Sequence, residues 1–236
     1  KKLRKKDSRI EILKNNGKGI IDALNTGLEM SKGKFITRMD ADDIMCPEKI
    51  KTLRDLLIKN GNKYLSTGCV SYFSSNKKMG DGYLKYAKWL NQLTIRCQNF
   101  KDIYKECSIP SSCWMMHKKD FDEIKGFKNL IYPEDYDFAF RTYYNNLKLV
   151  SSDKVLHLWR DHPKRISRNS SVYKYENFIP LKINYLLKYE LKKEQLILWG
   201  AGRKGKKIAK YLLEKSTTFI WISNNSKKIG HLIYNV

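Results

Sequence analysis

Helical and strand patterns alternate in the first part of the chain, and this alternation limits the possible folds more than any other sequence feature. Apolar residues recur at helical spacing over residues 20–30 and again over about 47–59. Residues 34–39 and 64–73 instead have the composition of strands. Such alternation favours a layered α/β domain with a mainly parallel sheet.

Three aspartates directly follow the predicted strand 34–39. Side chains alternate along extended chain, so Asp40 and Asp42 are expected to point the same way, into a crevice beyond the strand's carboxyl end. Carboxylate oxygens suit Mg²⁺ or Mn²⁺, and such a cation usually takes further ligands from substrate phosphates. The run therefore predicts a metal site for a diphosphate. The alternative is a solvated acidic turn before a helix that begins near Pro47.

Composition limits the class of protein. At 236 residues, 42% of them hydrophobic, the chain is long enough for one folded domain with an appendage. No apolar run approaches the roughly 18 to 20 residues that span a bilayer, and residues 1–20 lack the apolar centre of a signal peptide. We therefore expect a cytoplasmic protein. The five cysteines form no Cys-x-x-Cys pair, which favours reduced thiols over disulfides or zinc.

The formal net charge of +23 has three interpretations. The basic residues are spread from Lys1 to Lys228, so a compositional bias explains them without any partner. Attraction to an anionic membrane leaflet is the second interpretation, and it would place the protein peripherally at the inner face of the membrane. Nucleic-acid binding is the third, but the lysines and arginines are not clustered, and no specific nucleic acid is expected.

Several segments, in this order, resemble family-two glycosyltransferases. Residues 19–28 and 31–43 are similar to the nucleotide-sugar half of that family, and 133–138 to its acceptor-side Glu-Asp motif. Residues 159–168 continue the similarity, which covers roughly residues 9–170. The resemblance implies a GT-A fold, in which a Rossmann-like half binds the nucleotide. Members usually begin with further strands, so we expect an N-terminally truncated domain with an incomplete sheet.

The resemblance also implies roles for individual residues. Asp42 would coordinate the metal, Asp40 would lie near the ribose or the metal, and Asp43 would cap the following helix. His162 would reach the metal from a late loop, whereas His157, in an apolar strand, would be a buried structural residue. The other residues expected to contact the donor are Asn25, Arg38, Arg160 and Arg165. The arginines are candidates because the guanidinium group matches the geometry of phosphate oxygens.

A catalytic base is expected at Glu134-Asp135. An inverting displacement needs a carboxylate opposite the leaving group, and a like charge beside Asp135 would raise its proton affinity. The same residues, after Pro133, also form an ordinary helix start, and the two interpretations are compatible. Trp114 would stack on an acceptor sugar, although an aromatic residue in such a strand is also typical of a core.

The last part of the chain has a different pattern. We expect a glycosyltransferase domain over 1–175, a helical linker over 176–194 and a partial Rossmann-like segment over 195–236. Glycines 200, 202 and 205 fit the dinucleotide fingerprint between a strand and a helix. Asn224 stands where an acid would bind a ribose, so a short βαβ appendage is favoured over a nicotinamide site.

The sequence thus predicts an inverting, metal-dependent glycosyltransferase of the cell envelope. It would move a sugar from a nucleotide-sugar donor to a glycan or lipid-linked acceptor. Two alternatives remain open: a catalytically inactive remnant that binds nucleotide or carbohydrate, and a basic nucleic-acid-binding protein.

Overall fold

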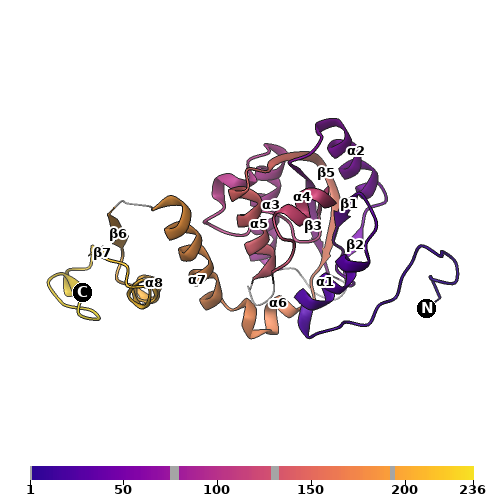
Figure 1. The fold of residues 1–236 in the computed structure, drawn as a ribbon. Coiled ribbons are helices and arrows are strands. Elements are labelled where there is room, and N and C mark those ends of the chain that lie inside the picture. Colours follow the sequence, from indigo (N-terminus) through magenta and orange to yellow (C-terminus); the bar gives the residue numbers. More distant parts are fainter. Residues whose placement is uncertain (1, 75–79, 129–132, 192–194) are drawn as a thin grey trace. The chain divides into compact units, whose positions relative to one another are not determined.

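The computed structural model divides into two compact units, Lys1–Arg165 and Ile166–Val236 (Figure 1). It describes residues 2–74, 80–128, 133–191 and 195–236. The domain limits expected from the sequence, at residues 175 and 195, stay a prediction.

The first unit alternates helices and strands as predicted. Those expected over 20–30, 34–39, 47–59 and 64–73 all form, with ends that differ by a few residues. In chain order the elements are α1 (Gly19–Met30), β1 (Phe35–Thr37), β2 (Ile44–Met45), α2 (Lys49–Asn60), β3 (Tyr64–Phe73), α3 (Asp81–Ile95), the 3₁₀ helix η1 (Asn99–Asp102), β4 (Trp114–His117), α4 (Lys118–Glu123), α5 (Glu134–Tyr144) and β5 (Lys148–Arg160).

These five strands form one mixed sheet in the order β1-β4-β3-β5-β2. The expectation of a mainly parallel sheet was wrong, because among the described residues of this sheet only β3 and β5 pair in parallel, over Tyr64–Phe73 and Lys148–Arg160. β4 lies antiparallel between β1 and β3, and β2 pairs antiparallel with β5. Alternation of helix and strand predicts which segments are strands, but not the direction in which each one enters the sheet.

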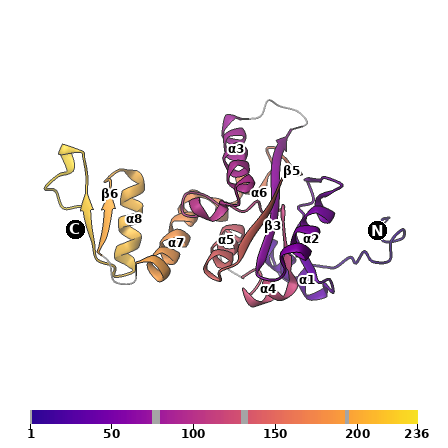
Figure 2. The ribbon, with the colours of Figure 1, turned by 90° about the horizontal axis from the view of Figure 1, so that it is seen from above.

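Helices pack on both sides of β3, with α2 on one side and α3 on the other (Figure 2). Leu53 and Leu57, four residues apart on α2, are completely buried, as expected for one face of an amphipathic helix. Asn91 on α3 accepts a hydrogen bond from the Val70 amide and donates one to the Val70 carbonyl, both at 2.9 Å. The Asn91 side-chain amide thus satisfies the Val70 backbone groups as a neighbouring strand would, beyond the point where pairing between β3 and β4 has ended.

Trp114 belongs to an aromatic core. Its side chain is 1% exposed, and its ring centroid lies 4.6 Å from that of Phe138 and 5.9 Å from that of Phe121. The indole N–H donates to the carbonyl of Ser111. A ring enclosed in this way has no face open to a sugar, so the expected stacking on an acceptor is not supported and the core interpretation fits.

The second unit contains the predicted βαβ element. β6 and β7 pair in parallel and are joined by α8. A Cβ atom at Gly205 would lie only 1.8 Å from the Gly200 carbonyl oxygen, which explains the glycine at this close approach. In chain order the elements are α6 (Ile166–Asn169), η2 (Ser171–Tyr173), α7 (Tyr175–Tyr185), the π-helical turn η3 (Leu186–Glu190), β6 (Leu196–Trp199), α8 (Arg203–Glu214), β7 (Phe219–Ile222) and η4 (Ser226–Lys228).

Two further expectations concern the chain as a whole. The helical linker expected over 176–194 corresponds to α7 and η3 up to Glu190, while residues 192–194 lie outside the described part. All five cysteines are free thiols. Among the described residues, no helix has both the length and the apolar character needed to cross a membrane.

Candidate functional site

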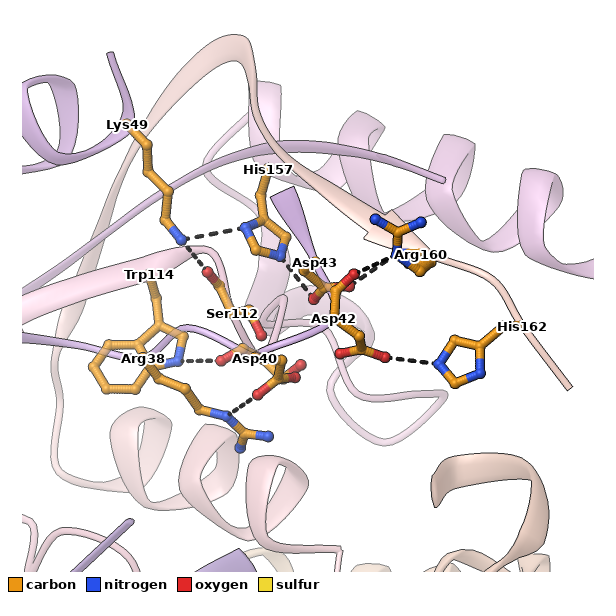
Figure 3. Close-up of polar contacts among 11 residues, drawn as sticks. Arg38, Asp40, Asp42, Asp43, Lys49, Ser112, Trp114, His157, Arg160 and His162 are labelled. Carbon is orange, nitrogen blue, oxygen red and sulfur yellow. Dashed lines mark hydrogen bonds and ion pairs between the residues drawn. The ribbon is translucent and has the colours of Figure 1, made fainter. Parts of the chain in front are cut away.

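The acidic run lies just beyond the carboxyl end of β1. The strand ends at Thr37, and a hydrogen bond from the Asp43 amide to the Asp40 carbonyl turns the chain. Strand alternation therefore no longer applies, and the three carboxylates diverge (Figure 3). Asp40 contacts Arg38, Asp42 contacts His162 and Asp43 contacts His157. The expectation that Asp40 and Asp42 point the same way was wrong for this reason.

Arg38 joins the acidic run to the first turn of α5. Its Nε donates to Asp40 Oδ1 and its Nη1 donates to Glu134 Oε1, each at 3.0 Å. The side chains of Arg38 and Glu134 are only 6% and 2% exposed. Burial lowers the pKa of Arg38, but Asp40, Glu134 and Asp135 raise it by more, so the guanidinium remains charged. The structure thus gives Arg38 and Glu134 a buried ion pair, and their expected contacts with substrate stay predictions.

Asp135 lies beside this ion pair at the amino end of α5. Pro133 precedes the helix as its N-cap, which confirms the predicted helix start. One Asp135 oxygen accepts the Tyr136 amide at 2.8 Å. Burial and the neighbouring Glu134 raise the Asp135 pKa from its ordinary 3.8 to about 7, against the opposing effect of Arg38. A carboxyl group that titrates near neutral pH is suited to take up a proton.

Asp42 and His162 form an accessible pair. Asp42 Oδ2 lies 2.9 Å from His162 Nε2, and the two side chains are 46% and 31% exposed. Partial burial raises the Asp42 pKa, but the His162 hydrogen bond and the charges of His162 and Arg165 lower it by more. Arg165 also lies over the ring of Tyr72, 5.6 Å from its centroid. A carboxylate, an imidazole and a guanidinium therefore meet at the surface beside the end of β1.

This pair is suited to a divalent metal only in combination with another ligand. Among the described residues, no group of three or more His, Cys, Asp or Glu side chains could hold a metal ion. Asp40 and Asp43 are bonded to Arg38 and His157, and Asp42 and His162 would contribute one carboxylate and one imidazole. Mg²⁺ and Mn²⁺ commonly complete such a partial ligand set with phosphate oxygens. The donor set therefore fits a cation that arrives with a diphosphate.

A second buried network holds Asp43. Its two oxygens bind the Arg160 amide and His157 Nε2, both at 2.9 Å. His157 Nδ1 lies 3.3 Å from Lys49 Nζ, which also donates to the Ser112 carbonyl (Figure 3). A charged ammonium only donates, so Nδ1 accepts, and the imidazole proton lies on Nε2 and faces Asp43. The expectation that Asp43 caps α2 was therefore wrong. The N-cap of α2 is Glu48, whose side chain forms no capping hydrogen bond.

Sequence reasoning missed Lys49 but identified His157. His157 is completely buried, which confirms its predicted structural character. Lys49 is also completely buried, and this burial lowers its pKa. The signal was present, because Lys49 stands four and eight residues before Leu53 and Leu57 and so shares the apolar face of α2.

The other expected donor residues are divided between two places. Arg160 lies at the acidic run, where its Nε donates to the Asp42 carbonyl at 2.7 Å and its guanidinium lies 4.5 Å from the ring centroid of Phe73. Asn25 instead lines a separate cavity of about 420 Å³ together with other α1 residues. None of the arginines or aspartates expected to bind the donor lines that cavity.

Comparison with known proteins shows the family. The chain matches the family described as glycosyl transferase family 2 over residues 1–125. It is 30% identical over 181 residues to an uncharacterized glycosyltransferase of Haemophilus influenzae, covering 73% of this chain and 53% of the relative. It is 27% identical over 169 residues to the Escherichia coli UDP-Glc:alpha-D-GlcNAc-diphosphoundecaprenol beta-1,3-glucosyltransferase WfaP, covering 70% of this chain and 61% of the relative.

The chain belongs to glycosyl transferase family 2, which confirms the family resemblance in the sequence. It spans about half the length of most of the curated relatives that it matches. Among solved structures, it is similar to S. aureus TarS 1–349 in complex with UDP-GlcNAc. That similarity has a TM-score of 0.48 and 18% identity, over 80% of this chain and 50% of the other.

Replacing Arg38 tests the buried ion pair. Arg38→Met should destabilise the protein by about 3–5 kcal/mol at neutral pH, because it leaves the Glu134 carboxylate buried without its partner. Urea unfolding at pH 7 measures this loss. Arg54→Met is the control, since Arg54 pairs with Asp55 at the surface and should change stability very little. Equal losses from the two variants would contradict the assignment.

Replacing Lys49 tests whether the second network fixes the acidic turn. Lys49→Met keeps the buried stem but removes the donor to His157, so stability should change by no more than about 2 kcal/mol. Amide hydrogen exchange over residues 40–45 should become about tenfold faster as the Asp43 contact loosens. Lys51→Met, on an exposed position of the same helix, should leave both quantities unchanged. Unaltered exchange in Lys49→Met would show that the turn does not depend on this network.

Proposed function

We propose that this chain is an inverting glycosyltransferase that uses a nucleotide-sugar donor. The observation that carries the proposal is the exposed Asp42–His162 pair at the end of β1, in a chain of glycosyl transferase family 2. The pair offers two metal ligands at the position where α/β sheets commonly bind substrates. Mn²⁺ or Mg²⁺ bound there would neutralise charge on the departing nucleoside diphosphate.

The donor site is built around the acidic turn. Asp42 and His162 would hold the cation, and Arg165 and Arg160 are close enough to the turn to contact phosphate oxygens. Asp40 is held by Arg38, so its proposed contact is with the ribose or the edge of the metal site. Asn25 remains a candidate for contact with another part of the donor.

Asp135 is the proposed general base. Its position beside Glu134 and its pKa of about 7 allow it to accept a proton at neutral pH. As the acceptor hydroxyl oxygen attacks C1 of the sugar, Asp135 takes the hydroxyl proton. The bond from C1 to the diphosphate oxygen breaks on the opposite face, and the nucleoside diphosphate leaves with the electron pair. Attack from the face opposite the leaving group inverts the configuration at C1.

The relatives suggest the substrate class. Two Escherichia coli relatives, WfgD and WfaP, bear the name UDP-Glc:alpha-D-GlcNAc-diphosphoundecaprenol beta-1,3-glucosyltransferase. We infer a UDP-sugar donor and a diphosphate-linked lipid acceptor for this chain as well. A lipid-linked acceptor would be reached by peripheral contact with an anionic membrane from the cytoplasmic side, which the net charge of +23 would support.

The affinity for UDP tests the proposed donor site. Wild-type protein should bind UDP with Mn²⁺ and lose most of that affinity in EDTA. Asp42→Asn should weaken Mn²⁺-dependent binding about 10- to 100-fold, because one of two protein ligands becomes neutral. Asp55→Asn, at an exposed helix position, is the control. Calorimetric binding of UDP, together with no sugar transfer in an activity assay, would favour the inactive remnant. A folded wild type that binds no UDP would refute the proposal.

Replacing Asp135 separates catalysis from stability. Turnover of the wild type should rise through about pH 7 as Asp135 loses its proton, and Asp135→Asn should lower it about 100-fold or more.

The raised pKa of Asp135 means that the folded state holds this proton between about pH 4 and pH 7, so stability falls as the pH rises through that window. Asp135→Asn should therefore be more stable than wild type at pH 8, by about 1–3 kcal/mol, and equally stable at pH 3.

Asp153→Asn, in an exposed part of β5, is the matched control and should show neither effect. Thermal unfolding at the two pH values and a pH–rate profile provide the measurements. An active Asp135→Asn variant would remove Asp135 from the mechanism, whatever its stability.

A further inference from the structure

A cavity lined mainly by lysines lies at the amino end of β1, and the proposed donor site does not use it. Its volume is about 510 Å³. Four lysines, one histidine and one aspartate contribute to its lining: Lys32, Lys34, Lys118, Lys119, His117 and Asp122.

The pairing of β1 with β4 brings these basic residues together. Phe35 is the register partner of His117, and the Lys118 amide donates to the Lys34 carbonyl at 2.8 Å. Two lysines before β1 and two after β4 consequently surround one space. Like charges repel, so the arrangement leaves positive charge that an anion would neutralise.

The carboxylate at this cavity compensates only part of that charge. Asp122 lies 3.3 Å from Lys118 Nζ, one turn away on α4. In the part of the chain that the structure describes, Lys32, Lys34 and Lys119 form no ion pair. His117 packs its ring against Phe35, and its Nε2 is buried without a hydrogen-bond partner among the described residues. The cavity therefore presents three ammonium groups, those of Lys32, Lys34 and Lys119, that pair with no carboxylate in the described part of the chain.

The cavity is separate from the acidic turn. Lys34 precedes β1, whereas Asp40 and Asp42 follow it, and three strand residues span on the order of 10 Å. A group held here does not occupy the proposed donor site, where Asp42 and His162 would bind a cation. The lysine cavity would accept a phosphate without a cation.

We propose that this cavity binds a phosphate group without a metal ion, from a free phosphorylated compound or from the headgroup of a phospholipid. Lysine binds phosphate as a compact point charge with three donors, and several lysines around one cavity suit a multiply charged oxyanion. The proposal is independent of sugar transfer and holds whether or not the chain is an active enzyme.

Calorimetry with inorganic diphosphate in EDTA tests the cavity on the full chain. The double variant Lys34→Glu/Lys119→Glu should weaken binding about tenfold or more. Lys85→Glu/Lys88→Glu on α3 is the matched control, because it changes the net charge equally at exposed positions away from the cavity, and its effect should stay below about twofold. Asp122→Asn should instead tighten binding by about two- to fivefold, since it releases Lys118. Circular dichroism confirms that each variant is folded.

Flotation with vesicles distinguishes the two sources of phosphate. Binding to phosphatidylcholine vesicles that contain phosphatidylglycerol, lost in Lys34→Glu/Lys119→Glu but kept in Lys85→Glu/Lys88→Glu, identifies a headgroup. Diphosphate binding with the same pattern, in the absence of flotation, identifies a free phosphorylated compound. Equal losses in both double variants would show an effect of net charge alone and overturn the proposal, as would a wild type that binds neither probe.

Discussion

The geometry of the candidate site depends on one buried cation. Arg38 connects Asp40, two residues away, with Glu134, 96 residues away. Without it, the end of β1 and the first turn of α5 would place carboxylates together in a region of low exposure, where unpaired charge is strongly destabilising. The guanidinium makes their approach favourable and fixes α5 against the strand end. Asp135, the neighbour of Glu134, is positioned by the same contact, and its raised pKa reflects burial and the carboxylate beside it.

A second buried network holds the other end of the acidic turn. Asp43 is fixed by His157 and by the backbone of Arg160, and Lys49 supports His157 from α2. The aspartates of the run consequently differ in their contacts. Asp40 and Asp43 bind cationic or N–H partners inside the protein, which leaves Asp42 with an exposed carboxylate on a turn held at both ends. If these residues bind a metal ion and a diphosphate as proposed, side chains that are already in place would lose less conformational entropy on binding.

The parts of this structure that could be predicted from sequence depend on local patterns. Helical spacing identified α1 and α2, and glycine spacing identified the turn between β6 and α8. Strand directions could not be predicted, because nothing local in residues 114–117 shows that β4 inserts antiparallel between β1 and β3. The same limit applies to side chains. The contact between Arg38 and Glu134 could not be predicted, because the two residues are 96 positions apart, and the aromatic neighbours of Trp114, Phe121 and Phe138, meet it only in the folded core.

The two ends of β1 carry opposite kinds of charged side chain, carboxylates at the carboxyl end and lysines at the amino end. At the carboxyl end, carboxylates gather: buried Arg38 pairs with Asp40 and Glu134, His157 hydrogen-bonds Asp43, and Asp42 keeps an exposed carboxylate. At the amino end, lysines gather around a cavity with one carboxylate among them. On the two proposals, a phosphate group would bind at the basic end without a metal ion and at the acidic end together with one. Metal dependence would therefore distinguish binding at the lysine cavity from binding at the proposed donor site.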